Sequence, residues 1–486
     1  MGKLKPLFAG ILACAVLLCS AACAQSSPPE AALSEPLPAV NSFLDDDGVR
    51  IQFDAPFTRI ISLYSAHTEN LYALGAGDRV LGGYTTCVYP PEAALLATFN
   101  YNGDPEAVIA ADPDLVLIRP FIRKKVPNYV AALQSAGIPV VSLYADSYEE
   151  FPAYIQKLAL LTGSEEIARQ KLIEFQQNID AITAKTAGIS DKQTVFLEAT
   201  ETNLRTVAAG SMGDMAIGFA GGINLAAGAQ AMSPGGSIAE YGVERILSHA
   251  DDIDVYVSQR GAMNAGGNLV SIGERAGYGA IKAVQNGRVY LINEKLISSP
   301  TFRYYKGVRE MARFLYPALM DDLGDLQNDR ITTKGDYAQL LVKALHLPIY
   351  LPTSSKANPV SQKAHGFGLF RDVHWEDPRF DAIETAVHGG YIEWEQTSDG
   401  QWFYPEQALS REKLAKTIFL LGEFQNKEIN TPIADLARCE KPRIVQILVD
   451  HGVFSLEDGS FHPDREVTNQ EVIAALRFVS GEGVVH

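Results

Sequence analysis

One long amphipathic stretch, Ser164 to Ala187, constrains the fold of this chain most strongly. No Gly or Pro interrupts it, and Thr162 with Glu165 has the spacing of a capping box. At 1.5 Å per residue it predicts a helix spanning roughly 35 Å. Its apolar residues recur at the period of one helix face, at Ile167, Ala168, Leu172, Phe175, Ile179 and Ile182.

Such a helix is either a strut between two lobes or an ordinary surface helix of one domain. The segments on its two sides favour the strut because they repeat one pattern. Glu106 precedes Asp114 by eight residues, Glu244 precedes Asp252 by eight, and an apolar strand follows each Asp. We therefore expect two related lobes.

The N-terminus has the features of a signal peptide over residues 1–24. A short basic region precedes an apolar core, Leu7 to Leu18, that is too short for a membrane span. Cys23 follows two Ala residues, which resembles a bacterial lipoprotein cleavage site with Cys23 as the lipid-bearing residue. Ser20 departs from that pattern, and ordinary cleavage after Ala24 is the alternative. Residues 25–41 are rich in Ser, Pro and Ala and predict a flexible tether.

Composition excludes several functional classes. Hydrophobic residues make up 47% and charged residues 20%, as in a globular protein. The net charge of −17 argues against a nucleic-acid partner. Only Cys87 and Cys439 lie outside the signal segment, so no disulfide scaffold is expected. There is no CxxC, HExxH, GxSxG or P-loop, so we expect no resident metal, no cofactor and no catalysis.

Strands alternate with helices before the long helix, which predicts a parallel sheet covered by helices over residues 42–146. Ligands of such sheets lie beyond the carboxyl ends of the strands. The candidate ligand-binding residues near that rim are Tyr64, Ser65, His67, Tyr84, Tyr89 and Arg119.

Two runs in this region carry a family resemblance. RIISLYSAHTENLYALGAGDRVLGG (59–83) and GDPEAVIAADPDLVLI (103–118) resemble the ferric-siderophore, haem and vitamin B12 binding proteins of ABC importers. The match runs from about Arg59 to Pro317. The family implies two α/β lobes joined by one rigid helix, here the linking helices of 147–187 followed by a second lobe over 188–320.

The resemblance also implies how such a protein meets its permease. One Glu on each lobe pairs with permease Arg residues, and Glu106 and Glu244 match those positions. The alternative is that each Glu only favours the start of its own helix.

The ligand chemistry rests on three further residue types. Arg119, Arg260 and Arg303 present forks suited to carboxylate or catecholate oxygens, which favours an anionic iron complex over neutral cobalamin. The tyrosines near the rim suit stacking on a flat ligand. His67 suits a metal ligand, although a lone His at a helix start is more often a surface residue.

The last part of the chain, 328–486, contains a repeat. Pro405 and Pro463 are 58 residues apart, as are Arg411 and Asn469, and a third copy of the last element starts at Ile331. A fixed period predicts an array of units that bury one another's apolar faces.

These units resemble S-layer homology domains, which implies an all-α repeat domain that binds anionic cell-wall polymer. The family's cationic groove position is Arg411 in one copy, Lys334 in another and Asn469 in the third. The alternative is a folded spacer without wall binding.

Together these features predict an α/β protein with two parallel-sheet lobes joined by one long helix, plus a C-terminal all-α repeat domain. The expected function is capture of an iron complex, a ferric siderophore or haem, for an ABC permease, by a lipid-anchored protein of the cell envelope. A corrinoid ligand, or an adhesin that binds no solute, is the alternative.

Overall fold

The structure is a computed structural model that describes residues 41–481, apart from 234–235, 265–267, 321–322, 327, 353–365, 423, 426 and 428–429. The predicted signal peptide and Cys23 lie outside the described residues. Among those that are described, no helix combines the length and hydropathy needed to cross a bilayer.

The first lobe is built on a parallel sheet with strand order β5-β4-β3-β6-β7. Its central strands are short apolar runs with every residue of β3, β6 and β7 buried, as expected for a sheet covered on both faces. The strands are β3 (Ile60–Ser62), β4 (Val80–Gly83), β5 (Ala97–Thr98), β6 (Leu115–Ile118) and β7 (Val140–Ser142). The helices are α1 (Ser65–Ala73), α2 (Glu106–Ala110), α3 (Pro120–Lys125) and α4 (Pro127–Ser135), and a hairpin of β1 (Ser42–Leu44) and β2 (Arg50–Gln52) precedes them.

The second lobe has a mixed sheet with order β11-β9-β8-β12-β13 and β10 beside β8. β10, β8, β12 and β13 pair in parallel, whereas β9 pairs antiparallel with both β8 and β11. The prediction of a parallel sheet therefore holds for the centre of this sheet only. The strands are β8 (Thr194–Thr200), β9 (Arg205–Val207), β10 (Ile223–Asn224), β11 (Ile238–Ala239), β12 (Val255–Arg260) and β13 (Val289–Asn293). The helices are α7 (Met212–Phe219), α8 (Val243–Ser248), α9 (Leu269–Gly273), α10 (Lys282–Gln285), α11 (Glu294–Ile297) and α12 (Tyr304–Leu315).

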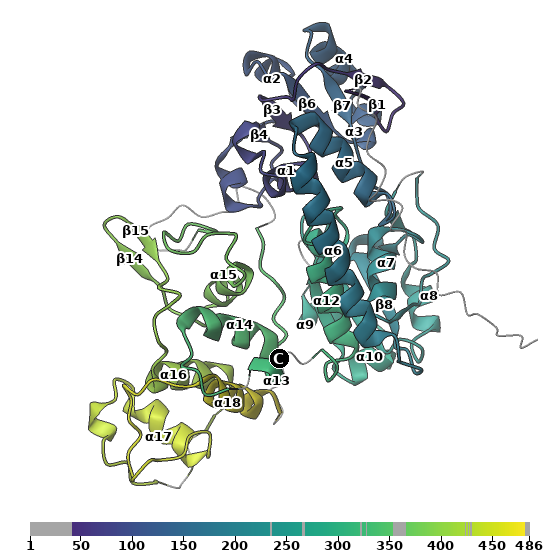
Figure 1. The fold of residues 1–486 in the computed structure, drawn as a ribbon. Helices are drawn as coiled ribbons and strands as arrows, with labels where there is room; N and C mark the ends of the chain where they lie inside the picture. The colour runs from purple at the N-terminus through teal and green to yellow at the C-terminus, as the bar shows by residue number, and fades with distance from the viewer. Residues whose placement is uncertain are drawn as a thin grey trace, which may run out of the picture. The chain divides into compact units, whose positions relative to one another are not determined.

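The long helix is confirmed as α6 (Glu165–Thr186), preceded by α5 (Phe151–Thr162). It runs from the first lobe, beside α5, to the second lobe, beside α7 and α12 (Figure 1). Its predicted apolar face is buried except for Ile167, which is 41% exposed. The capping box is wrong, because Ser164 is the N-cap and the Thr162 hydroxyl donates instead to the Leu158 carbonyl (3.0 Å).

The repeated Glu and Asp pattern that predicted two lobes is shifted by two residues in the second lobe. Asp114, before β6, accepts the Thr58 backbone N–H at 2.8 Å. Its structural counterpart is Asp254, before β12, which accepts the Thr194 N–H at 2.8 Å. Asp252 is exposed in the preceding turn. The lobes are therefore related as predicted, but the eight-residue spacing does not align equivalent aspartates.

The lobes also meet directly along α1, against the segment 294–303 of the second lobe. The Lys295 ammonium donates to the Ser65 hydroxyl at 2.9 Å, and the Asn70 amide donates to the Pro300 carbonyl at 2.8 Å. Residues 65–71 are all buried, because α1 lies between its own sheet and this segment. We call this contact the lobe junction.

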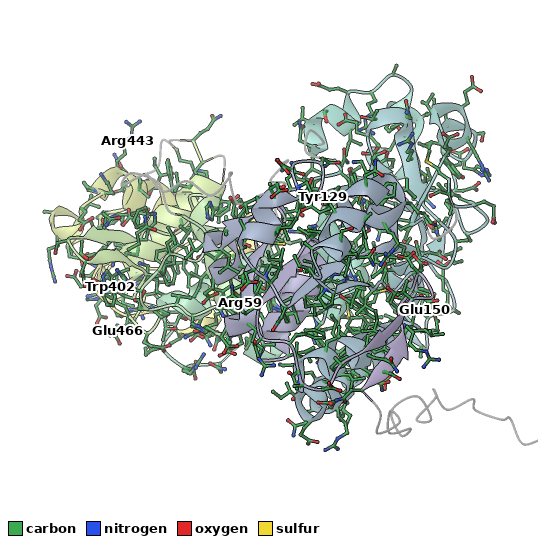
Figure 2. The ribbon with its side chains drawn as sticks, turned by 90° about the horizontal axis from the view of Figure 1, so that it is seen from above. Arg59, Tyr129, Glu150, Trp402, Arg443 and Glu466 are labelled. Carbon is green, nitrogen blue, oxygen red and sulfur yellow. The ribbon has the colours of Figure 1, made fainter. Side chains whose placement is uncertain are left out.

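The C-terminal unit is mainly helical. Its helices are α13 (Leu323–Leu326), α14 (Lys334–Ala344), α15 (Phe380–His388), α16 (Arg411–Leu421), α17 (Pro442–Asp450) and α18 (Asn469–Gly481). A short hairpin of β14 (Glu395–Thr397) and β15 (Gly400–Trp402), with Trp402 labelled in Figure 2, corrects the all-α prediction.

The three repeat positions are structurally equivalent. Each of α14, α16 and α18 begins where the N–H of its first residue donates to a carbonyl from another repeat: Lys334 to Gln407 (2.8 Å), Arg411 to Arg465 (2.8 Å) and Asn469 to Arg330 (2.9 Å). The repeats therefore hold one another by backbone hydrogen bonds at their helix starts.

Candidate ligand-binding site

A cavity of about 1280 Å³ lies between the two lobes, and we call it the cleft. It is larger than the roughly 300–1,000 Å³ of ordinary small-molecule pockets. The first lobe lines it with residues that follow β6 and β7, among them Arg119, Phe121 and Tyr144, as predicted for the carboxyl ends of parallel strands. The second lobe lines it with Arg205, Met232 and Met263 among others.

Arg119 is the predicted residue that the structure places in the cleft. Its guanidinium carbon lies 4.9 Å from the ring centre of Tyr64 and 5.7 Å from that of Tyr144. Aromatic faces thus support the cation. Among the described residues, no carboxylate forms an ion pair with it.

Arg205, at the start of β9, lines the cleft from the second lobe, and the sequence analysis missed it. It has no ion pair among the described residues, and its Nε is buried without a hydrogen-bond partner there. The chain contains 58 acidic and 41 basic residues, so two arginines without carboxylates are unexpected. No motif or period marks Arg205, because it follows an irregular turn.

The carboxylates of the cleft are partly neutralised. Asp46 pairs with Lys157 at 2.5 Å. Asp146 and Glu150 lie together, since Glu150, which is labelled in Figure 2, accepts the Asp146 backbone N–H at 2.8 Å. Burial, together with the Glu150 charge, raises the pKa of Asp146. Arg119, Arg205 and Lys124 are the cleft cations without an ion pair in the described structure.

The predicted residues at the start of α1 lie behind the cleft wall. Tyr64 is half-buried beneath Arg119, and Ser65 holds Lys295 in the lobe junction. His67 is fully buried, with Nε2 2.8 Å from the Leu143 carbonyl oxygen. Burial lowers the pKa of His67 to about 3, so the imidazole stays neutral. The structure therefore places His67 in the packing of the first lobe.

Tyr84 and Arg260 are not brought to the cleft. The Tyr84 ring stacks on Tyr101 with centres 4.7 Å apart. Arg260 is the exposed last residue of β12. Neither residue lines the cleft.

Tyr89 and Arg303 line a different cavity, of about 500 Å³. Arg303 donates to Glu69 through Nε (2.7 Å) and Nη2 (2.9 Å), and its guanidinium carbon lies 3.5 Å from the Tyr89 ring centre. Glu69 belongs to α1, so this pair is part of the lobe junction. The Arg303 charge is thus compensated inside the protein.

Glu106 and Glu244, the residues predicted to dock the permease, are both exposed at helix starts. Each is exposed in the first turn of a short helix, α2 or α8, that precedes the equivalent strands β6 and β12. Neither has an ion pair among the described residues.

The two cations predicted to bind polymer are both buried, Lys334 being 8% exposed, and they differ in their surroundings. Arg411 is only 3% exposed and donates to the carbonyls of Phe461 (2.8 Å) and Ser455 (2.6 Å). Lys334 lines a pocket of about 170 Å³ with Trp394, Lys413 and Lys416. Burial lowers the pKa of Lys334 to about 8. Among the described residues, no group of three or more His, Cys, Asp and Glu is placed to hold a metal ion.

Comparison with known proteins finds similarity over the region of the two lobes. The family model described as "Periplasmic binding protein" matches residues 60–296. The uncharacterized ABC transporter substrate-binding lipoprotein YvrC of Bacillus subtilis is 26% identical over 325 residues, 65% of this chain and 98% of the relative. A vitamin B12-binding protein of Vibrio campbellii is 26% identical over 260 residues, 53% of this chain and 89% of the relative.

Solved structures also resemble this chain. A possible iron-binding, periplasmic solute-binding protein from Staphylococcus epidermidis has a TM-score of 0.46 at 23% identity, covering 54% of this chain and 99% of that one. The vitamin B12 binding protein BtuF of Vibrio cholerae has a TM-score of 0.44 at 24% identity, covering 54% and 98%.

The lobe junction leads to a prediction about stability. Glu69→Gln removes the carboxylate and leaves Arg303 buried with its charge uncompensated, so we expect a loss of about 3–5 kcal/mol in the free energy of unfolding. Urea unfolding of the purified protein measures this loss. Glu106→Gln, at an exposed carboxylate, is the matched control and should leave the midpoint unchanged. A Glu69→Gln protein as stable as the control would contradict a structural role for the pair.

Proposed function

We propose that this chain, whose two-lobed part is homologous to the substrate-binding proteins of ABC transporters, captures an iron complex in the cleft and delivers it to a permease. The observation that carries the ligand chemistry is the pair Arg119 and Arg205, which line the cleft from opposite lobes without ion-pair partners in the described chain. A ligand with anionic groups at two edges, a ferric siderophore or haem, would satisfy both. Capture and release need no catalytic residue.

The physical argument for an anionic ligand is that its negative groups would neutralise the two arginine charges in the cleft. A guanidinium held away from carboxylates binds an incoming carboxylate or catecholate with charge-assisted, bidentate hydrogen bonds. Tyr64, Phe121 and Tyr144 surround Arg119 and offer flat apolar faces to a flat ligand.

A corrinoid is the second candidate. Its support is the vitamin B12-binding relatives, together with the carboxylates that share the cleft with the cations. A large neutral ligand with peripheral amides would use both kinds of group for hydrogen bonds. An adhesin that binds no solute would leave Arg119 and Arg205 without a role.

The docking proposal assigns Glu106 and Glu244 to the permease. Both carboxylates are exposed and sit at equivalent places in the two lobes. The lobes are tied by α6 and by the junction, so the distance between the two carboxylates is constrained. Two permease arginines at a matching distance would recognise that spacing.

The envelope attachment has two proposed parts. The signal segment and the lipoprotein relative support export with a lipid on Cys23. In the C-terminal unit, the resemblance to S-layer homology domains and the lysine-lined pocket support binding of an anionic wall polymer. Lys334 is a better candidate than Arg411 for contact with the polymer, because the Arg411 guanidinium already donates to two backbone carbonyls. A spacer without polymer binding is the alternative.

The cleft proposal is tested by calorimetric titration of the purified protein with haem, a ferric catecholate siderophore and cyanocobalamin. Heat is the better signal, because all three tryptophans, Trp375, Trp394 and Trp402, lie in the C-terminal unit. We expect Arg205→Gln to weaken binding of the anionic ligand by about 10- to 100-fold, the loss of one charged hydrogen-bonding group. Arg260→Gln, at an exposed site outside the cleft, is the control. Silence for all three ligands would contradict the proposal.

The docking proposal is tested by separating uptake from binding. A Glu106→Gln, Glu244→Gln double variant should keep the ligand affinity of the wild type, because neither residue lines the cleft. It should lose most ligand uptake in cells, because both permease contacts lose their charge. Glu165→Gln, an exposed carboxylate on α6, should change neither quantity. Unimpaired uptake by the double variant would contradict the docking proposal. The two carboxylates would then only stabilise the starts of their own helices.

Cell fractionation tests the two attachments separately. Cys23→Ser should move the protein out of the membrane fraction, because Cys23 is the residue proposed to carry the lipid. Lys334→Gln should lower cosedimentation of the purified protein with cell wall, with Lys441→Gln, exposed and outside the pocket, as control. Equal pelleting of both lysine variants would favour the spacer.

A further inference from the structure

A second cavity, which we call the junction cavity, lies beside the lobe junction. Its volume is about 500 Å³, and it shares no lining residue with the cleft. It is lined by α1, α6, the segment 302–306 and residues 375–378 of the C-terminal unit. Pockets for small molecules measure roughly 300–1,000 Å³ and occur preferentially where domains meet. The junction cavity therefore has the size and the place of a ligand site, and the proposed function makes no use of it.

The wall that the C-terminal unit contributes is packed against the lobes. The Trp375 ring lies edge-to-face with Tyr89, with centres 6.2 Å apart, and the Phe380 ring lies edge-to-face with Tyr89 at 6.4 Å. Lys306 of α12 forms an ion pair with Asp381 of α15. These contacts hold Trp375 at the mouth formed with the lobes, so the cavity has a fixed wall on this side.

Aromatic side chains supply the apolar part of the lining. Several of them are half-buried and so keep part of their surface open, namely Tyr72, Phe302, Tyr305 and Trp375. Aromatic faces of this kind pack on a flat apolar surface of a ligand.

The polar part of the lining carries both signs of charge. Lys171 and Glu174, one turn apart on α6, both line the cavity, and neither has an ion pair among the described residues. Arg303 donates to Glu69 through Nε and Nη2, whereas its Nη1 is buried without a hydrogen-bond partner there. A buried donor that lacks an acceptor is costly, and a ligand oxygen would satisfy it. The cavity thus offers donors and an acceptor for one ligand.

This combination selects a neutral ligand with many hydroxyl groups. An anion would bring its charge next to Glu174, and a cation would bring its charge next to Lys171 and Arg303. A hydroxyl group both donates and accepts, so it can bond to either kind of side chain. A sugar ring adds a flat face of C–H groups to such a rim of hydroxyls.

We propose that the junction cavity is a second binding site, for a neutral saccharide. The sugar ring lies against the aromatic side chains, and its hydroxyls accept from Lys171 and Arg303 and donate to Glu174. This site is independent of the cleft and its ligand, because the two cavities have separate walls.

The test is a titration of the full-length protein with glucose, galactose, N-acetylglucosamine and diacetylchitobiose. Tryptophan emission reports occupancy, because Trp375 lines the cavity. We expect a saturable change in emission with at least one of these sugars, and Trp375→Phe should abolish that change.

Calorimetry of variants then locates the bound sugar. Lys171→Ala and Glu174→Ala should each weaken binding about 10- to 100-fold, the loss of one charged hydrogen-bonding group. Both residues lie on the outer part of α6, where alanine keeps the helix. Glu165→Ala, exposed on the same helix and outside the cavity, is the matched control and should bind as the wild type does.

Two results would overturn the proposal. One is the absence of any response to all of these sugars, in emission and in heat. The other is an affinity that is unchanged in Lys171→Ala and Glu174→Ala but falls in Lys334→Gln, which would move the sugar to the lysine-lined pocket of the C-terminal unit. Either result leaves the proposed function of the cleft standing, because Arg205→Gln tests that function separately.

Discussion

The buried ion pair between Glu69 and Arg303 is the contact on which the two-lobed arrangement depends. Its carboxylate comes from α1 of the first lobe and its guanidinium from the second, and both side chains are less than 10% exposed. In such a site the attraction is strong, but so is the cost of either charge left alone. The lobes therefore stay together at this face, while α6 joins them along its length.

A fixed junction has a consequence for binding. Because the lobes cannot separate at α1 without exposing this pair, the cleft walls are in place before a ligand arrives. In the proposed function, Arg119 and Arg205 are then preorganised on opposite walls, which would reduce the entropy lost when a ligand binds. Glu294 and Lys295 add to this order, since Glu294 holds the Met263 backbone and Lys295 holds the first lobe.

The C-terminal unit is held together by backbone hydrogen bonds between its repeats. Three helices start at equivalent positions, and the first residue of each donates its N–H across to another repeat. Asp372 and Asp435 play matching roles, each accepting two backbone N–H groups from the segment that precedes α16 or α18. The repeat is therefore a scaffold of backbone hydrogen bonds, and differences among its copies lie in side chains such as Lys334.

Local patterns in the sequence were enough to determine α6 and the strands at the centre of both sheets, because each depends on periodicity within a short segment, and a fixed spacing was enough to determine the repeat. The spacing that predicted two related lobes did not align equivalent aspartates, and the structure was needed to match Asp114 with Asp254. Tertiary packing alone decided the site. Arg119 lines the cleft as predicted, whereas His67 packs inside the first lobe and Tyr89 and Arg303 lie at the lobe junction. Arg205, Met232 and Met263, which were not predicted, line the cleft from irregular turns. The physical reason is that periodicity reports which face of an element is apolar. Which polar side chain meets solvent, a partner charge or a cavity is set by residues as distant in sequence as Glu69 and Arg303.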